Sequence, residues 1–80
     1  MSWNYRLVKI GEEDGLPVFW MQEVYYDENG KENGMCDPFL TSNSPEEMET
    51  ILDRMKLDIR GRPIFEAPKE WVDSSNDKRE

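Results

Sequence analysis

The chain has 80 residues, of which 18 are acidic and 10 basic, so its formal net charge is -8. This length suits one small domain that buries only ~60% of the surface of its unfolded form. Three residues each of Trp, Tyr and Phe argue against wholesale disorder, because disordered chains are poor in aromatic residues. The excess of acid disfavours direct binding to nucleic-acid phosphates and to anionic membranes.

The sequence also bears on location. No apolar run reaches the ~18 residues that span a bilayer, and residues 1–6 lack the charged and apolar regions of a signal peptide. The single Cys36 has no partner for an intramolecular disulfide. These features predict a cytoplasmic protein in a reducing compartment, with no membrane partner.

Two strands are expected first. Residues 3–10 are rich in aromatic and β-branched types and end at the turn cluster 11–15. Residues 16–27 form a second aromatic-rich run, and Asn29-Gly30 favours a type I′ turn after it. A third strand is expected over Glu32 to Leu40, at a sheet edge because of Pro38.

The turn fixes an expected register. A two-residue Asn29-Gly30 loop pairs Val24 with Met35 and Trp20 with Phe39, while an even-length first loop pairs Arg6 with Glu23 and Val8 with Met21. One sheet face would then carry Trp3, Tyr5, Leu7, Trp20, Val24, Tyr26, Met35 and Phe39. The other would carry Val8, Ile10, Phe19, Met21, Tyr25, Cys36 and Leu40.

A helix is predicted from Ser44 to Gly61. Ser44 can cap it, Pro45 suits its first turn, and Glu47 lies three residues after the cap. An apolar stripe at i, i+3, i+4 and i+7 is expected to pack on the sheet, with Leu52 buried; it consists of Met48, Ile51, Leu52 and Met55.

The C-terminal part is expected to be extended and then disordered. Pro63 and Pro68 favour an extended segment in which Ile64 and Phe65 anchor beside the sheet. Residues 73–80 hold no large apolar side chain and are predicted to be disordered, so the domain covers 1–72. The predicted fold class is α+β: a three-stranded antiparallel β-meander, one helix packed on one face and an extended C-terminal segment that can add a short edge strand.

No chemical motif emerges. The chain has no His, the commonest general base and metal ligand near neutral pH, so Cys36 has no His partner to activate it as a nucleophile. The acidic turn residues lack the ligand spacing of a calcium loop, and no glycine-rich phosphate cradle occurs. We therefore expect no catalytic, cofactor-binding or metal-binding residue, and a protein that is not an enzyme.

Two segments carry a resemblance. The chain has Ser-Trp-Asn-Tyr-Arg at 2–6 and Glu-Val-Tyr-Tyr-Asp-Glu-Asn-Gly at 23–30, followed by a helix from Ser44. Over residues 2–65 it resembles a group of small bacterial proteins of unknown function that begin with the same run. The resemblance implies a bacterial or phage-related cytosolic origin and no particular activity.

One helix covers only one face of a sheet, and both faces of the second strand read as apolar. We therefore expect a protein-binding module or a homodimer, with a possible interface of Val8, Ile10, Phe19, Met21 and Leu40. Strand addition at an exposed edge is a second form of interface. The alternative function is a nucleic-acid mimic that inhibits a basic nucleic-acid-binding protein, although the acidic surface fits plain solubility equally well.

Overall fold

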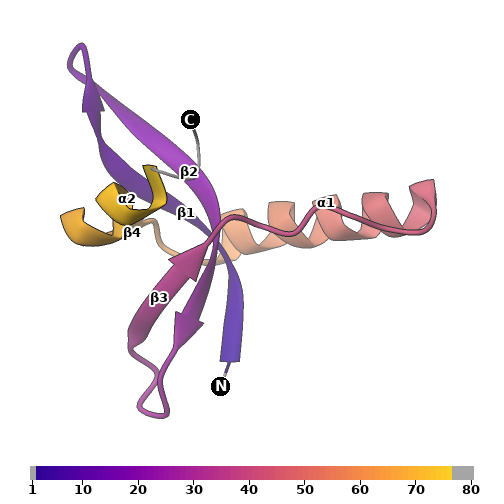
Figure 1. Ribbon diagram of the computed structural model, residues 1–80. Coiled ribbons are helices and arrows are strands. Elements are labelled where there is room, and N and C mark those ends of the chain that lie inside the picture. The colour runs from indigo at the N-terminus through magenta and orange to yellow at the C-terminus, as the bar shows by residue number, and fades with distance from the viewer. Residues whose placement is uncertain (1, 77–80) are drawn as a thin grey trace.

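The computed structural model describes residues 2–76 and shows a mixed four-stranded sheet with two helices. The elements are β1 (Ser2–Glu13), β2 (Leu16–Tyr26), β3 (Glu32–Cys36), α1 (Pro45–Gly61), β4 (Phe65–Glu66) and α2 (Lys69–Asn76). The strand order is β3-β2-β1-β4, in which β1, β2 and β3 form an antiparallel meander and β4 runs parallel to β1 (Figure 1). The α+β class is confirmed. The extended C-terminal segment adds the short edge strand β4, and α2 is a second helix that was not predicted.

The hairpin from β2 to β3 keeps the predicted register but not the predicted turn. Val24 pairs with Met35 as expected, whereas Trp20 does not pair with Phe39, because β3 ends at Cys36 before Pro38. Gly30 has φ 80°, but Asn29 is not left-handed, so the type I′ prediction is wrong. A tight turn instead closes through Gly30 N–H donating to the Asp27 carbonyl at 3.0 Å.

The hairpin from β1 to β2 contains a β-bulge that the sequence analysis missed. Gly11 pairs with Val18, but Lys9 pairs with Phe19, so Ile10 is left without a partner on β2. Gly11 has φ 153°, a conformation that favours glycine. From Lys9 back to Ser2, each residue of β1 therefore pairs with a residue of β2 that is one position away from its predicted partner.

This shift moves β1 to the opposite faces of the sheet. Arg6 pairs with Gln22 rather than Glu23, and Val8 pairs with Trp20 rather than Met21. Because side chains alternate along a strand, one face carries Trp3, Tyr5, Leu7, Phe19, Met21, Glu23, Tyr25 and Cys36. The other carries Asn4, Arg6, Val8, Trp20, Gln22, Val24, Tyr26 and Met35.

Helix α1 begins and ends where the sequence predicts. The Ser44 hydroxyl accepts the Glu47 N–H at 3.1 Å, Pro45 stands in the first turn and Gly61 is the last residue. Only Met55 and Asp58 of this helix are buried, and its N-terminal half projects away from the sheet (Figure 1). The predicted burial of Leu52 is therefore wrong, since 49% of its surface is exposed.

The C-terminal part departs further from expectation. Phe65 pairs with Val8 as the start of β4, but Ile64 is exposed, so only one of the two predicted anchors holds. Helix α2 was not predicted; its Trp71 ring lies 5.7 Å from that of Phe65, and Val72 is buried. Helix α2 extends over 73–76 of the segment predicted to be disordered, and 77–80 lie outside the described residues.

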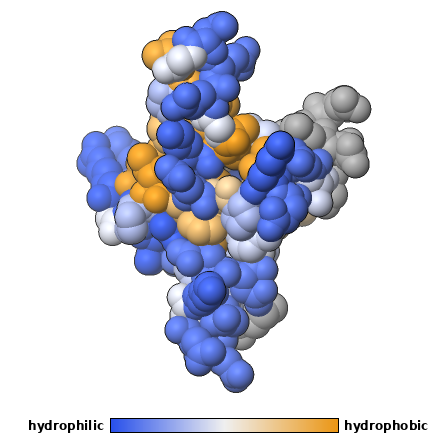
Figure 2. Space-filling model, turned by 90° about the vertical axis from the view of Figure 1, so that its left-hand side faces the viewer, coloured by the Kyte–Doolittle hydropathy of each residue, from blue (hydrophilic) through white to orange (hydrophobic). Residues whose placement is uncertain are grey.

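The hydrophobic core is small. Its buried apolar side chains are Tyr5, Val8, Val24, Met55 and Val72. The radius of gyration is 13.4 Å, larger than the about 11.6 Å typical of a compact chain of this length. Apolar surface also remains visible between the mostly hydrophilic projecting ends (Figure 2). Within residues 2–76, no helix is long and apolar enough to cross a membrane.

Candidate interaction surface

The most distinctive feature of the molecule is an arm, defined here as residues 37–61, which comprises α1 and the segment 37–44 before it. Helix α1 is about 25 Å long at 1.5 Å per residue. The nine peptide steps from Cys36 to Pro45 span at most about 32 Å. Since the C-terminal half of α1 contacts the sheet, the segment must run nearly extended alongside the helix to reach its far end (Figure 1).

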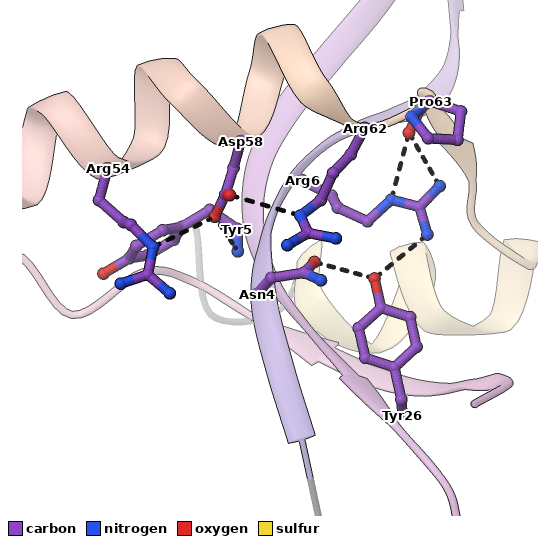
Figure 3. A network of polar contacts seen from close by, with 8 residues as sticks. All are labelled: Asn4, Tyr5, Arg6, Tyr26, Arg54, Asp58, Arg62 and Pro63. Carbon is purple, nitrogen blue, oxygen red and sulfur yellow. Dashed lines mark hydrogen bonds and ion pairs between the residues drawn. The ribbon is translucent and has the colours of Figure 1, made fainter. Parts of the chain in front are cut away.

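Asp58 attaches the arm to the sheet. Its Oδ2 accepts the backbone N–H of Tyr5 at 3.2 Å, on the edge of β1 that faces away from β2 (Figure 3). The same carboxylate forms ion pairs with Arg54 of its own helix at 4.0 Å and with Arg62, the residue after the helix, at 3.3 Å. Asp58 is buried, and removing a carboxylate from water costs free energy. The amide hydrogen bond and the two ion pairs offset this cost.

Arg6 holds the chain that leaves α1. Its guanidinium donates to the Pro63 carbonyl at 2.8 and 3.2 Å, pairs with Glu32 at 2.7 Å and lies 5.2 Å from the centre of the Phe65 ring. Burial lowers the pKa of Arg6, but hydrogen bonds to Tyr26 and Glu32 outweigh burial and raise it overall. Arg6 is therefore a guanidinium cation that links β1 to β3 through Glu32, and to the chain after α1 through Pro63.

Asn4 extends this polar network. The Tyr26 hydroxyl lies 2.8 Å from the Asn4 amide and also accepts from Arg6 at 3.3 Å (Figure 3). With the amide NH₂ turned toward Tyr26, the Asn4 oxygen accepts from the Arg62 guanidinium at 3.2 and 3.3 Å. Arg62 then joins the hydrogen-bond network of Asp58 to that of Arg6. The joined network holds the C-terminal end of α1 in a fixed orientation on β1.

Glu23 anchors the segment 37–44. Its carboxylate accepts the Phe39 N–H at 3.1 Å, the Tyr25 hydroxyl at 2.7 Å and the Cys36 thiol at 3.7 Å. The contact with Cys36, followed by that with Glu23, raises the pKa of Tyr25. Cys36 is half-buried in this cluster, so its surroundings give it a packing role.

The arm carries a large share of the exposed apolar surface. Its exposed large apolar side chains are Phe39, Leu40, Leu52, Leu57 and Ile59. A hollow of about 300 Å³ lies where the arm meets β1, lined by Trp3, Tyr5, Thr50, Ile51 and Arg54. The Trp3 ring meets the Tyr5 ring edge-on at 5.1 Å and remains 45% exposed. Apolar surface thus continues from the arm to the start of β1.

Charge is unevenly distributed along α1. The acidic residues Glu46, Glu47, Glu49 and Asp53 occupy its N-terminal half, and the basic residues Arg54, Lys56 and Arg60 occupy its C-terminal half. Asp58, the acidic exception in the second half, is buried and already paired. The exposed surface of the helix is therefore negative at the free end and positive near the sheet.

The structure separates the five residues predicted as an interface. Val8 is fully buried in the core, and Ile10 is the half-buried residue of the bulge. Phe19 and Met21 share a face of β2, and Leu40 lies on the arm. The exposed residues of α1 were missed; Leu57, which lies off the predicted stripe, was the signal that this helix is apolar on more than one side.

The acidic turns behave as ordinary turns. The Asp27 carboxylate accepts the N–H groups of Asn29 at 2.8 Å and Lys31 at 3.0 Å, so it stabilises its own hairpin. In the described part of the chain, no three His, Cys, Asp or Glu side chains lie close enough together to hold a metal ion.

Comparison with protein-family models, with characterised proteins and with solved structures gave no match. The function must be argued from the geometry of the chain itself.

Proposed function

We propose that the chain is a non-enzymatic protein-binding module and that the arm is its binding surface. The observation that carries this proposal is the exposure of α1: Leu52 and Leu57 are 49% and 65% exposed, while only Met55 and Asp58 are buried. Burying apolar surface contributes roughly 25 cal/mol per Å² to the free energy of association. The exposed apolar side chains of the arm therefore favour a complex in which a partner covers them.

The attachment of the arm supports the same proposal. Asp58 fixes the helix to Tyr5, and Glu23 fixes the preceding segment through Phe39. A surface held in its binding geometry before the partner arrives loses less conformational entropy on binding than a flexible one.

The edge of β1 gives less support to strand addition. The carboxylate of Asp58 occupies the outward N–H of Tyr5, and β4 pairs with Val8 and Lys9. An added strand needs a continuous row of free backbone groups, so the arm is the better candidate.

Nucleic-acid mimicry gains no specific support. The acidic clusters lie in the turn after β1, in the turn after β2 and at the free end of α1, which point in three directions (Figure 1). This distribution fits solubility as well as mimicry, so we propose the protein-binding function alone.

The test is site-specific photo-cross-linking in cells of the source organism. A photoreactive residue in place of the exposed Ile59 should form covalent protein adducts, while one in place of Glu28, in the exposed turn after β2, should not. A further Leu52→Glu change, on the same face of α1, should remove the Ile59 adducts without lowering the melting temperature of the isolated monomer. Equal labelling from the two positions, or none from either, would overturn the proposal.

A further inference from the structure

We infer that the partner of the arm is a second copy of this chain, bound through an antiparallel pair of α1 helices. This inference rests on the proposed function and adds the identity and orientation of the partner. Three features of α1 carry it: the spacing of its apolar residues, the position of two unpaired charges and the asymmetry of its overall charge.

The spacing comes first. Met48, Leu52, Met55 and Ile59 follow one another at intervals of four, three and four residues, which is the heptad spacing of helices that pair along a seam. Leu52 and Ile59 are 49% and 41% exposed, and Met48 is half-buried. Met55 already packs against its own sheet, so the free apolar surface of the seam comes mainly from the other three residues.

An antiparallel alignment matches these residues in layers. Placing Leu52 opposite Met55 of the second copy also places Met48 opposite Ile59 of that copy. The two-fold symmetry repeats both layers: Met48 meets Ile59 in the outer two, and in the inner two Leu52 lies over the largely covered Met55. The two sheets then lie at opposite ends of the helix pair, because each α1 is attached near its C-terminus.

The charges beside the seam favour the same alignment. Glu49 and Lys56 each follow an apolar seam residue, are exposed and make no ion pair within residues 2–76. In the antiparallel alignment Glu49 lies beside Lys56 of the second copy, and the symmetry makes the contact twice. In a parallel alignment the two copies of this flank lie on opposite sides of the helix pair, so the contact between Glu49 and Lys56 is lost.

The charge asymmetry of the whole helix acts in the same direction. Antiparallel pairing lays the acidic half of one α1 over the basic half of the other, and the two helix dipoles oppose each other. The net charge of -8 on each chain repels the copies at long range. Physiological salt screens that repulsion over about 8 Å, while charges in contact remain attracted.

The experiment measures the molar mass of the full chain by sedimentation equilibrium across a concentration series. The wild type should approach twice the monomer mass, and Leu52→Glu should remain monomeric. At a concentration at which the wild type is also monomeric, the two should share one melting temperature. Glu49→Lys and Lys56→Glu should each raise the dissociation constant of the dimer roughly tenfold, because each change creates two like-charge contacts. The double variant Glu49→Lys/Lys56→Glu should return it to near the wild-type value.

Two results would overturn the antiparallel dimer. One is a wild type that stays monomeric at millimolar concentration. The other is a dimer whose dissociation constant is the same in the single charge variants as in the double variant. A monomer that still gives Ile59 adducts with another protein in cells would reject the second copy as partner and leave the proposed function in place, so the two proposals fail separately.

Discussion

The carboxylate of Asp58 accepts the backbone N–H of Tyr5 at 3.2 Å, although 53 residues separate them in the chain. It is a contact between a helix side chain and an otherwise open strand edge, and it sets where α1 meets the sheet. Asp58→Ala would leave that N–H without an acceptor at a buried position, so we expect a loss of about 1–3 kcal/mol in the free energy of unfolding. Urea unfolding measures this loss. Asp53→Ala, an exposed change on the same helix, should stay within about 0.5 kcal/mol; equal losses would show that the contact contributes nothing.

The two halves of the apolar stripe on α1 should differ in their contribution to stability. Met55→Ala removes a buried side chain and should cost about 2–5 kcal/mol, while Leu52→Ala acts on a half-exposed side chain and should cost less than about 1 kcal/mol. Thermal and urea unfolding of the two variants, measured at a concentration where the chain is monomeric, provide the comparison. A larger loss for Leu52→Ala would mean that the outer part of the helix folds back onto the sheet.

Acid should weaken the link between β1 and β3. A hydrogen bond from its own backbone, followed by one from Arg6, holds the pKa of Glu32 below its ordinary value. A carboxyl group with a lowered folded-state pKa stabilises the fold above its unfolded pKa of about 4.3, and this contribution is lost as the pH falls through the folded value. Wild type should therefore exceed Glu32→Gln in stability at neutral pH and lose that advantage in acid.

Urea unfolding from pH 7 to pH 3 provides the measurement for Glu32. Glu28→Gln, in the exposed turn after β2, is the control and should change little. A difference between wild type and Glu32→Gln that stays constant through the acid range would contradict the role assigned to the pair with Arg6.

Helix α2 should contribute to the fold through Val72. Val72→Ala removes two buried carbon groups, and at about 0.8 kcal/mol each the loss should be at least about 1.6 kcal/mol. Ser74→Ala, at an exposed position of the same helix, serves as the control. Should both variants melt at the wild-type temperature, α2 would be shown to lie loosely on the sheet.

Local signals predicted the parts of the fold that local chemistry decides. Ser44 and Pro45 place the start of α1 because capping needs only a few neighbouring residues, and Val24 finds Met35 because the turn between their strands is short. The Ile10 bulge has no comparable signal apart from Gly11. Because side chains alternate along a strand, that single residue moved all of β1 to the wrong faces.

The missed features depend on contacts between distant residues. Helix α2 has only eight residues and two large apolar side chains, Trp71 and Val72, too few to predict a helix without the sheet beneath it. The exposure of the arm depends on Asp58, a residue that reads as solvent-facing in a helical pattern yet is buried against β1. The residues of the predicted interface do not share one face for a related reason, since they were grouped by a register that the bulge changes.

The near-extended segment 37–44 limits how this chain can vary in length. Removing two residues would leave seven peptide steps, at most about 25 Å, which barely equals the length of α1. The helix would then have to begin about one turn later and lose the cap at Ser44. An insertion meets no such obstacle, because a longer segment reaches the same point with slack. Length changes here should therefore be tolerated in one direction only, and α1 can grow only if this segment grows with it.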